Sequence, residues 1–309
     1  MWWLTGVVLV AASLSAQPVR GEAPTGHTVV RELAVDGLIR SYRLYTPAEL
    51  PVNQPAPLVL AFHGFGMNAA SMQRLIQLDS ITDREGFLVA YPEGTGFTSW
   101  QLTFNAGGVL PPFDTGLPDD VEFTRRLIDE VAANMNIDPG RVFATGFSNG
   151  AMMCYRLAAE LSDRIVAIAP VAGTQAIPFA SPPRPVPVCH FHGTSDMIVP
   201  TTGPIETTPP FLTFLSLDET IQTWVTNNGN PTPSRPVLLE NVAYDATRVT
   251  RSIWTDGEAP PSIVLYSITG GDHAWPGSRI PSNPLTGRTS RDIQASELLW
   301  DFFAAHPRP

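Results

Sequence analysis

Three residues of the sequence, a serine, an aspartate and a histidine, each follow an apolar run and together could do covalent chemistry. Ser148 stands in Gly-Phe-Ser-Asn-Gly at positions 146–150, and Asp196 closes the segment His-Gly-Thr-Ser-Asp at 192–196. His273 lies in the glycine-rich segment 269–276. A serine hydroxyl becomes a nucleophile when a neutral imidazole takes its proton, and a carboxylate holds that imidazole in the right tautomer. The order Ser, Asp, His is the one expected on an α/β-hydrolase sheet.

The serine lies where an apolar run, residues 142–147, passes directly into a helical pattern. Strand, sharp turn and helix form the context that a G-x-S-x-G nucleophile elbow requires. The serine then takes a strained backbone conformation, and the small residues two positions away let strand and helix pass closely. Because such a short motif also arises by chance, its significance depends on a base, an acid and an oxyanion hole elsewhere in the chain.

The other histidines fit structural positions better than the position of a base. His27 lies in a predicted hairpin and His306 in the tail, whereas His63 precedes a glycine turn that its ring would brace. His190 and His192 share one face of a predicted strand, which would also suit a metal site. Since no carboxylate or thiolate cluster accompanies them, we favour a packed structural role and predict no metal.

Among the acids, Asp196 is the best candidate to orient the base. Asp272 is adjacent to His273 and should point away from it, and Asp218 and Asp245 lie in or near less ordered segments. No carboxylate follows the apolar run that ends at position 171, which is the other common location for the acid.

Two backbone amides must converge to stabilise an oxyanion. Asn149, directly after the serine, supplies one, and the turn at 63–66 supplies the other, from Phe65 or alternatively from Gly64 or Gly66. Aromatic side chains at the mouth of the site would suit acyl or phenolic groups. For this role we single out Trp275, two residues from the base, and Trp100, for which core packing is an equal alternative.

The supporting pattern is one of buried strands alternating with helices, which predicts an α/β fold with a mostly parallel central sheet and helices on both faces. An Asp-Gly turn signal at 36–37 predicts an N-terminal antiparallel hairpin. Residues 174–185 leave no room for a large cap domain, and 94–118 should form a surface loop. Strands are expected at 27–35, 38–45, 57–62, 87–92, 142–147, 165–171, 186–192, 248–254 and 263–268, and helices at 69–78 (continued loosely to 85), 119–134, after 150, 217–227 and 293–304.

The start of the chain and the composition indicate an exported protein. Residues 1–16 resemble a signal peptide with an apolar run and a small-residue cleavage site, which leaves 17–309 as a single catalytic domain. No other stretch is apolar enough to span a membrane. The net charge of −10, with 19 basic and 29 acidic residues and no basic cluster, argues against nucleic-acid binding. Cys154 and Cys189 are expected to be free, buried thiols.

Taken together, the motifs resemble the secreted esterases of the polyhydroxybutyrate depolymerase and feruloyl/acetylxylan esterase group. The resemblance spans roughly residues 25–306, and the family's triad falls on Ser148, Asp196 and His273. Family members often carry a cysteine where this chain has Phe65, so a disulfide expected by analogy is absent. Polymer-degrading relatives frequently append a substrate-binding domain, which this sequence does not show. The motifs are His-Gly-x-Gly at 63–66, Tyr-Pro-Glu at 91–93, Asp-Asp-Val-x-Phe at 119–123, Gly-x-Ser-Asn-Gly-Ala-Met at 146–152, His-Gly-Thr-x-Asp at 192–196 and Gly-x-His-x-Trp-Pro-Gly at 271–277.

The expected function is therefore that of a secreted (extracellular or periplasmic) serine esterase that needs no cofactor and acts as a monomer. Its substrate would be an ester of the polyhydroxyalkanoate or polyester type, as an oligomer or amorphous polymer, or a feruloyl or acetyl ester of plant polysaccharide. Two alternatives are a peptidase of the same fold and a non-catalytic polymer-binding protein on a hydrolase scaffold. The second alternative expects a broken triad, and all three members are present.

Overall fold

The computed structural model describes residues 25–50, 54–96, 98, 101–178, 180–257, 259–280 and 287–308. The predicted signal peptide at 1–16 and Trp100 lie outside the described residues. Within the described part of the chain, no helix is long and apolar enough to cross a membrane.

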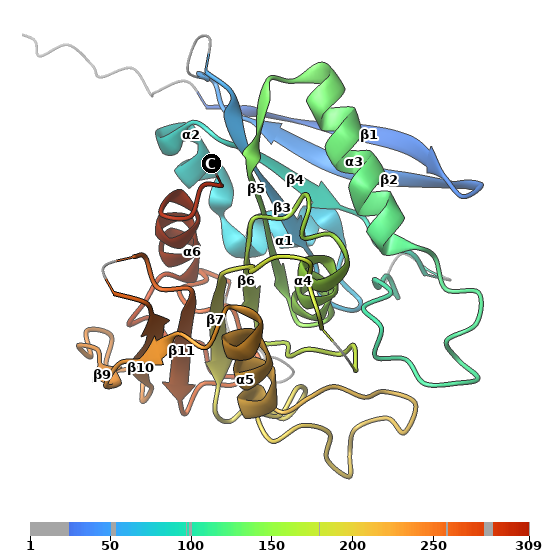
Figure 1. Cartoon of the computed structure of the whole chain (residues 1–309). Coiled ribbons are helices and arrows are strands. Elements are labelled where there is room, and N and C mark those ends of the chain that lie inside the picture. Colours follow the sequence, from blue (N-terminus) through green and yellow to red (C-terminus); the bar gives the residue numbers. More distant parts are fainter. Residues whose placement is uncertain are drawn as a thin grey trace, which may run out of the picture.

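The described strands form one sheet whose centre is parallel and whose edges are antiparallel (Figure 1). The strand order is β1-β2-β4-β3-β5-β6-β7-β11-β10-β8, with the short β9 paired to β10. The parallel strands are β4 (Leu88–Pro92), β3 (Ala56–Phe62), β5 (Ile137–Phe147), β6 (Ala167–Val171), β7 (Val188–Gly193) and β11 (Ile263–Thr269). The antiparallel edges are β1 (His27–Val35) with β2 (Leu38–Thr46), and β10 (Arg248–Thr255) with β8 (Thr232–Pro233) and β9 (Val237–Leu238).

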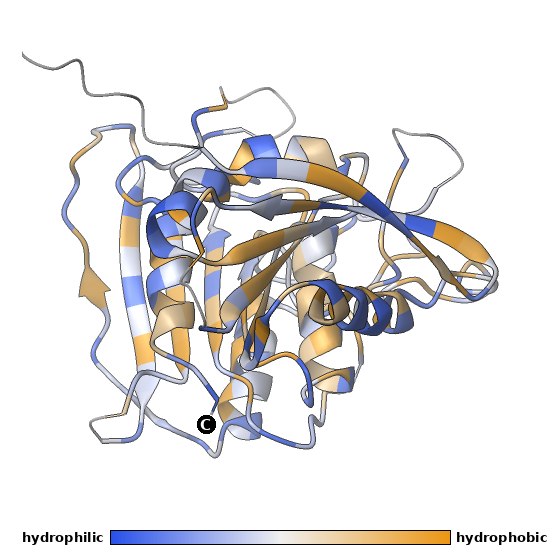
Figure 2. Cartoon of the chain, turned by 90° about the horizontal axis from the view of Figure 1, so that it is seen from above, coloured by the Kyte–Doolittle hydropathy of each residue, from blue (hydrophilic) through white to orange (hydrophobic). Residues whose placement is uncertain are grey.

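Helices cover both faces of this sheet, so the central strands are buried on both sides, as their continuous apolar runs predict. The helices α3 (Asp120–Asn134), α4 (Asn149–Glu160) and α5 (Leu217–Asn227) pack into one core cluster. The helices α1 (Ala69–Ile76), α2 (Leu78–Glu85) and α6 (Ala295–Ala304) belong to a second cluster on the other face. Figure 2 shows the apolar strands between helices whose outward sides are hydrophilic.

The predicted fold class is confirmed, and two local predictions are wrong. The helix expected to run from 69 toward 85 is divided at Gln77, which has a left-handed φ of 52° and lies between α1 and α2. The strand expected at 142–147 is longer than predicted, because β5 begins at Ile137 paired with Ala56 of β3. The side chain of Asp138 accepts the Gly140 amide at 2.8 Å, so the turn-type contact is present inside the strand.

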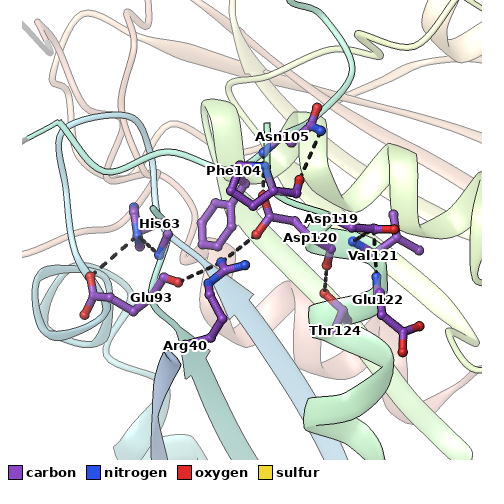
Figure 3. A network of polar contacts seen from close by, with 12 residues as sticks. Arg40, His63, Glu93, Phe104, Asn105, Asp119, Asp120, Val121, Glu122 and Thr124 are labelled. Atoms are coloured by element: carbon purple, nitrogen blue, oxygen red, sulfur yellow. Dashed lines mark hydrogen bonds and ion pairs between the residues drawn. The ribbon is translucent and has the colours of Figure 1, made fainter. Parts of the chain in front are cut away.

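A buried ion pair connects the edge of the sheet to the loop before α3 (Figure 3). Arg40 of β2 donates to Asp120 at 2.6 Å, and both side chains are almost fully buried. The second Asp120 oxygen accepts the backbone amide of Asn105 at 2.7 Å. Asp119 instead caps α3 by accepting the amides of Val121 and Glu122. Asp120 thus holds the 94–118 loop against the sheet.

We expect Arg40→Met to destabilise the fold by about 3–5 kcal/mol, because removing one partner leaves the buried Asp120 carboxylate without its counter-charge. The matched control is Arg84→Met, which removes an exposed pair of Arg84 with Glu297 at the same 2.6 Å separation. That change should lower stability by about 1 kcal/mol or less. Urea unfolding monitored by circular dichroism measures both, and equal losses for the two variants would contradict the prediction.

Candidate active site

Ser148 lies at a sharp turn between β5 and α4, in a backbone conformation that is rare for a residue with a side chain. Its φ is 56° and its ψ is −118°, and the residue is 9% exposed. A Cβ atom at Gly146 would collide with the carbonyl of Gly150, and one at Gly150 would collide with the carbonyl of Phe62. Both glycines are thus required by the close passage of strand and helix, which explains the spacing of the motif.

The candidate acid and the candidate base lie after two adjacent parallel strands. Asp196 follows β7 and His273 follows β11, and the register pairs Gly193 with Ile268 near the ends of these strands. The Nδ1–H of His273 donates to Asp196 Oδ2 at 2.8 Å, with Asp196 2% and His273 5% exposed. Because a carboxylate only accepts, this bond leaves Nε2 of the neutral ring as an acceptor, which is the form that a general base needs.

The Asp196 carboxylate stays ionised in spite of its burial. Its Oδ1 accepts the amides of Ile198 at 2.9 Å and Val199 at 2.8 Å. Burial by itself raises the pKa of this carboxyl, but the hydrogen bonds from His192 and His273 outweigh that effect and hold the pKa well below its usual value. The acid is therefore a fixed negative charge at neutral pH.

The elbow contacts His273 through the residue that precedes the serine. The ring of Phe147, the residue before the serine, packs against the His273 ring with centroids 4.8 Å apart. Within the residues that the structure describes, the Ser148 hydroxyl has no hydrogen-bond partner. Catalytic hydrogen bonds are often long in an enzyme without substrate and tighten when substrate binds.

The turn at 63–66 lies against Ser148. A Cβ built on Gly64 would be 3.3 Å from the Ser148 Cβ and 3.1 Å from the Phe147 ring. The Gly66 amide donates to the carbonyl of Leu102 at 2.9 Å, so it is not available to an oxyanion. Among the described residues, no acceptor is bound by the Phe65 amide. Of the amides considered from the sequence, Phe65 thus stays a candidate and Gly66 does not.

Asn149 contributes more than its amide. Its backbone N–H, at the first turn of α4, binds no acceptor among the described residues. Its side chain accepts the Phe104 amide at 2.8 Å and donates to the Phe104 carbonyl at 3.0 Å. This side chain therefore fastens the 94–118 loop to the elbow. Its contact with Phe104, 45 positions away, could not be read from the sequence.

His63 braces the site, as its position before a glycine turn predicts. Its Nδ1 donates to the Gly64 carbonyl at 2.8 Å and its Nε2 accepts the Gly94 amide at 3.0 Å. Its ring is fully buried and packs against Phe104, with centroids 4.7 Å apart. Burial lowers the pKa of His63 to about 4, so the ring is neutral at neutral pH.

The proposed position of Trp275 at the mouth of the site is wrong. This residue is 2% exposed, belongs to the core on the α1/α6 side and donates its indole N–H to Ser296 at 3.1 Å. Exposed apolar side chains that sequence reasoning missed lie next to the catalytic candidates. They are Met197 and Ile198, directly after Asp196 and 69% and 49% exposed, and the side chain of Phe65, 65% exposed. Two apolar residues directly after a catalytic acid were the available signal.

Two further histidines and both cysteines lie in the core. His190 and His192 bind each other at 3.0 Å in the core. Within the described residues, no group of three metal-ligating side chains is found. Cys154 and Cys189 are free and buried, as predicted.

Comparison with known proteins was made at the levels of sequence and structure. A family model described as phospholipase/carboxylesterase matches residues 48–224. NocK of Nocardia uniformis subsp. tsuyamanensis, whose name describes it as an esterase, is 32% identical over 89% of this chain and 82% of its own length. Feruloyl esterase B of Piromyces equi is 30% identical over 74% of this chain, and poly(3-hydroxyalkanoate) depolymerase C of Paucimonas lemoignei is 26% identical over 75%. The chain spans 41% and 58% of the lengths of these last two relatives. The predicted resemblance is confirmed.

A solved structure supports the fold. The acetyl xylan esterase from Aspergillus awamori superposes with a TM-score of 0.61, covering 90% of this chain and 99% of its own at 14% identity. At this identity the likeness concerns the fold alone.

The backbone strain at Ser148 has a measurable consequence. Ser148→Gly should be more stable than Ser148→Ala by about 1 kcal/mol, because glycine tolerates a positive φ whereas alanine keeps a strain of about 1–3 kcal/mol. At Ser80, an exposed residue of α2, the order should reverse, since glycine is about 1 kcal/mol worse than alanine in a helix. Denaturant unfolding of the four variants measures both differences. If Ser148→Ala proved at least as stable as Ser148→Gly, Ser148 would not be strained.

The buried, neutral His63 should make the fold sensitive to acid. As the pH falls from 6.5 to about 4, the unfolded chain binds a proton at this residue before the folded chain does, so stability is lost in this window. The loss is about 1.4 kcal/mol per pH unit, or about 2 kcal/mol between pH 7 and pH 5. The stability advantage of the wild type over His63→Gln should shrink by that amount. Replacing the exposed His27 by Gln is the control, and a gap that is independent of pH for His63→Gln would contradict the prediction.

Proposed function

The chain belongs to the phospholipase/carboxylesterase family, and from this premise we propose that it is a secreted serine esterase that cleaves carboxylic esters through an acyl-enzyme. Ser148 is the nucleophile, His273 the general base and Asp196 the acid that orients the base. The observation that carries the proposal is the 2.8 Å bond from His273 Nδ1 to the buried Asp196, beside a serine in a strained elbow.

In the first half of the reaction, His273 Nε2 takes the hydroxyl proton of Ser148 as the oxygen attacks the ester carbonyl. The negative charge of the tetrahedral intermediate is held by the amides of Phe65 and Asn149, each worth about 3 kcal/mol of transition-state stabilisation. His273 then gives its proton to the leaving alcohol. In the second half, water is activated by the same base and releases the acid from Ser148.

Asp196 stabilises the positive charge that His273 acquires during the reaction. When His273 becomes an imidazolium, the ionised carboxylate at Nδ1 stabilises the new charge without itself taking a proton. The fixed charge of Asp196 is stabilised by hydrogen bonds from two backbone amides and His273 and by His192 Nε2 at 3.4 Å. The chemistry uses side chains and backbone amides alone, so the proposal includes no cofactor.

The substrate class is an ester of a plant polysaccharide or of a polyester chain. This follows the names of relatives as feruloyl esterase and poly(3-hydroxyalkanoate) depolymerase. The exposed apolar side chains of Phe65, Met197 and Ile198 border the proposed catalytic groups and suit an apolar acyl group. Residues 17–309 would act as one catalytic domain and a monomer, exported by a signal peptide at 1–16 to the periplasm or the medium.

The two alternatives make different demands on the site. A peptidase of the same fold would use the same groups but cleave an amide. A non-catalytic polymer-binding protein would not need an ionised Asp196 bonded to His273, which is an arrangement that activates a serine.

We expect Ser148→Ala to abolish hydrolysis of short p-nitrophenyl esters and to abolish labelling by a fluorophosphonate probe. Its denaturant midpoint of unfolding should stay near that of the wild type. Only an activated serine reacts with such a probe, so labelling separates an enzyme from a binding protein. Ser80→Ala, which changes an exposed serine of α2, is the control and should label fully. Unchanged turnover by Ser148→Ala would disprove the assignment.

A panel of substrates then distinguishes the ester classes. Feruloyl, acetyl-xylan, hydroxybutyrate and terephthalate esters should give measurable kcat/KM values for at least one class, with peptide substrates as the comparison. Faster cleavage of peptides than of every ester would favour the peptidase alternative.

A further inference from the structure

A buried row of three polar side chains leads from α4 to the proposed acid of the triad. Tyr155 Oη lies 2.7 Å from His190 Nδ1, and His190 Nε2 lies 3.0 Å from His192 Nδ1. His192 Nε2 lies 2.8 Å from the carbonyl of Val199 and 3.4 Å from Asp196 Oδ2. All three side chains are at most 1% exposed. His190 and His192 are two residues apart along β7, so both rings lie on the same face of the sheet.

The hydrogen bonds in this row run in one direction. The Val199 carbonyl and the Asp196 carboxylate can only accept, so His192 Nε2 must carry a hydrogen. In a neutral ring His192 Nδ1 then accepts, His190 Nε2 donates to it and His190 Nδ1 accepts from the hydroxyl of Tyr155. Burial, followed by the neighbouring His192, lowers the pKa of His190 well below its ordinary value, which keeps that ring neutral. Every donor in the row therefore points toward the Asp196 turn, and bonds aligned in this way polarise one another.

His192 acts on Asp196 by two routes. Its Nε2 lies 3.4 Å from Oδ2, the oxygen that also accepts from His273. It also holds the carbonyl of Val199, whose amide donates to Asp196 Oδ1 at 2.8 Å. The carboxylate is thus fixed from the side of the core by His192 and from the side of the site by His273.

We propose that His192 is a positioning residue, which holds the Asp196 carboxylate in the orientation that aligns His273. This inference rests on the proposed function for its kinetic consequence. Its structural part, the geometry of the bond between Asp196 and His273, can be measured without any turnover.

The test compares His192→Leu, which removes the donor, with His192→Gln, whose amide N–H can replace Nε2–H. For p-nitrophenyl ester hydrolysis, His192→Leu should lower kcat about 10- to 100-fold with KM within about twofold, since small misplacements of catalytic groups have effects of this size. His192→Gln should restore most of the kcat. If His192 were merely structural, both variants would lose stability, and kcat would not fall selectively in His192→Leu at a nearly constant KM.

The matched control is Asn228→Leu. Asn228 is also buried and binds the amide and carbonyl of Val186 at 2.8 and 3.0 Å, at the opposite end of β7 from Asp196. This variant should lose stability in urea unfolding to an extent comparable to His192→Leu and keep the wild-type kcat. A fall in its kcat equal to that of His192→Leu would attribute the effect to general loosening and overturn the proposal.

The readout without substrate is the proton NMR signal of His273 Nδ1–H. In the wild type this proton, bound to a carboxylate, should resonate far downfield, with Asp196→Asn as the reference that removes it. His192→Leu should weaken or shift the signal and His192→Gln should retain it. An unchanged signal in His192→Leu overturns the inference even if Ser148 proves not to be a nucleophile.

Should His192→Leu fail to fold, His192→Asn carries the same test. Asparagine can still accept from His190 through an atom near Nδ1, but it is too short to reach the Val199 carbonyl. It should therefore resemble His192→Leu in kcat and in the NMR signal. A wild-type kcat in His192→Asn would show that the donor to the Asp196 turn is not needed.

Discussion

The interaction on which the site depends is the burial of an ionised carboxylate at the end of β7. A carboxylate 2% exposed is stable only if its oxygens are bonded, and Asp196 accepts from two amides and from His273, with His192 Nε2 3.4 Å from Oδ2. The parallel pairing of β7 with β11 brings the acid and the base side by side, because the carboxyl ends of parallel strands meet at one edge of the sheet. The orientation of His273 is therefore a consequence of sheet topology.

The 94–118 loop, which borders the site, is fixed by polar contacts from the core. Asn149 binds both backbone groups of Phe104, and the Arg40–Asp120 pair holds the Asn105 amide in the same loop. The neighbouring amide of Gly94 bonds to the buried ring of His63 (Figure 3 shows this region). Ordering a glycine-rich loop costs conformational entropy, which these contacts offset. These contacts order it where it borders the nucleophile.

Most of the fold could be predicted because its signals are local. Continuous apolar runs predict the buried strands, and the bounds expected for the helix at 217–227 are those of α5. The triad candidates followed from chain order and from their places at strand ends. The failures depend on tertiary contacts. The bond from Asn149 to Phe104 and the burial of Trp275 on Ser296 are decided by residues far apart in sequence. No local spacing encodes them.

The presence of histidine at both 190 and 192 has a physical reason. The acid needs a donor from the core, yet a lysine or arginine there would bury a second charge and compete with His273 for the same carboxylate oxygen. A hydroxyl on a short side chain would not span the distance from β7 to the Val199 carbonyl. A neutral imidazole donates at one nitrogen and accepts at the other, so each added ring needs one further donor behind it. The last group in the row must therefore donate a hydrogen bond to His190 without needing a donor from the row itself. The Tyr155 hydroxyl, 2.7 Å from His190 Nδ1, meets this requirement.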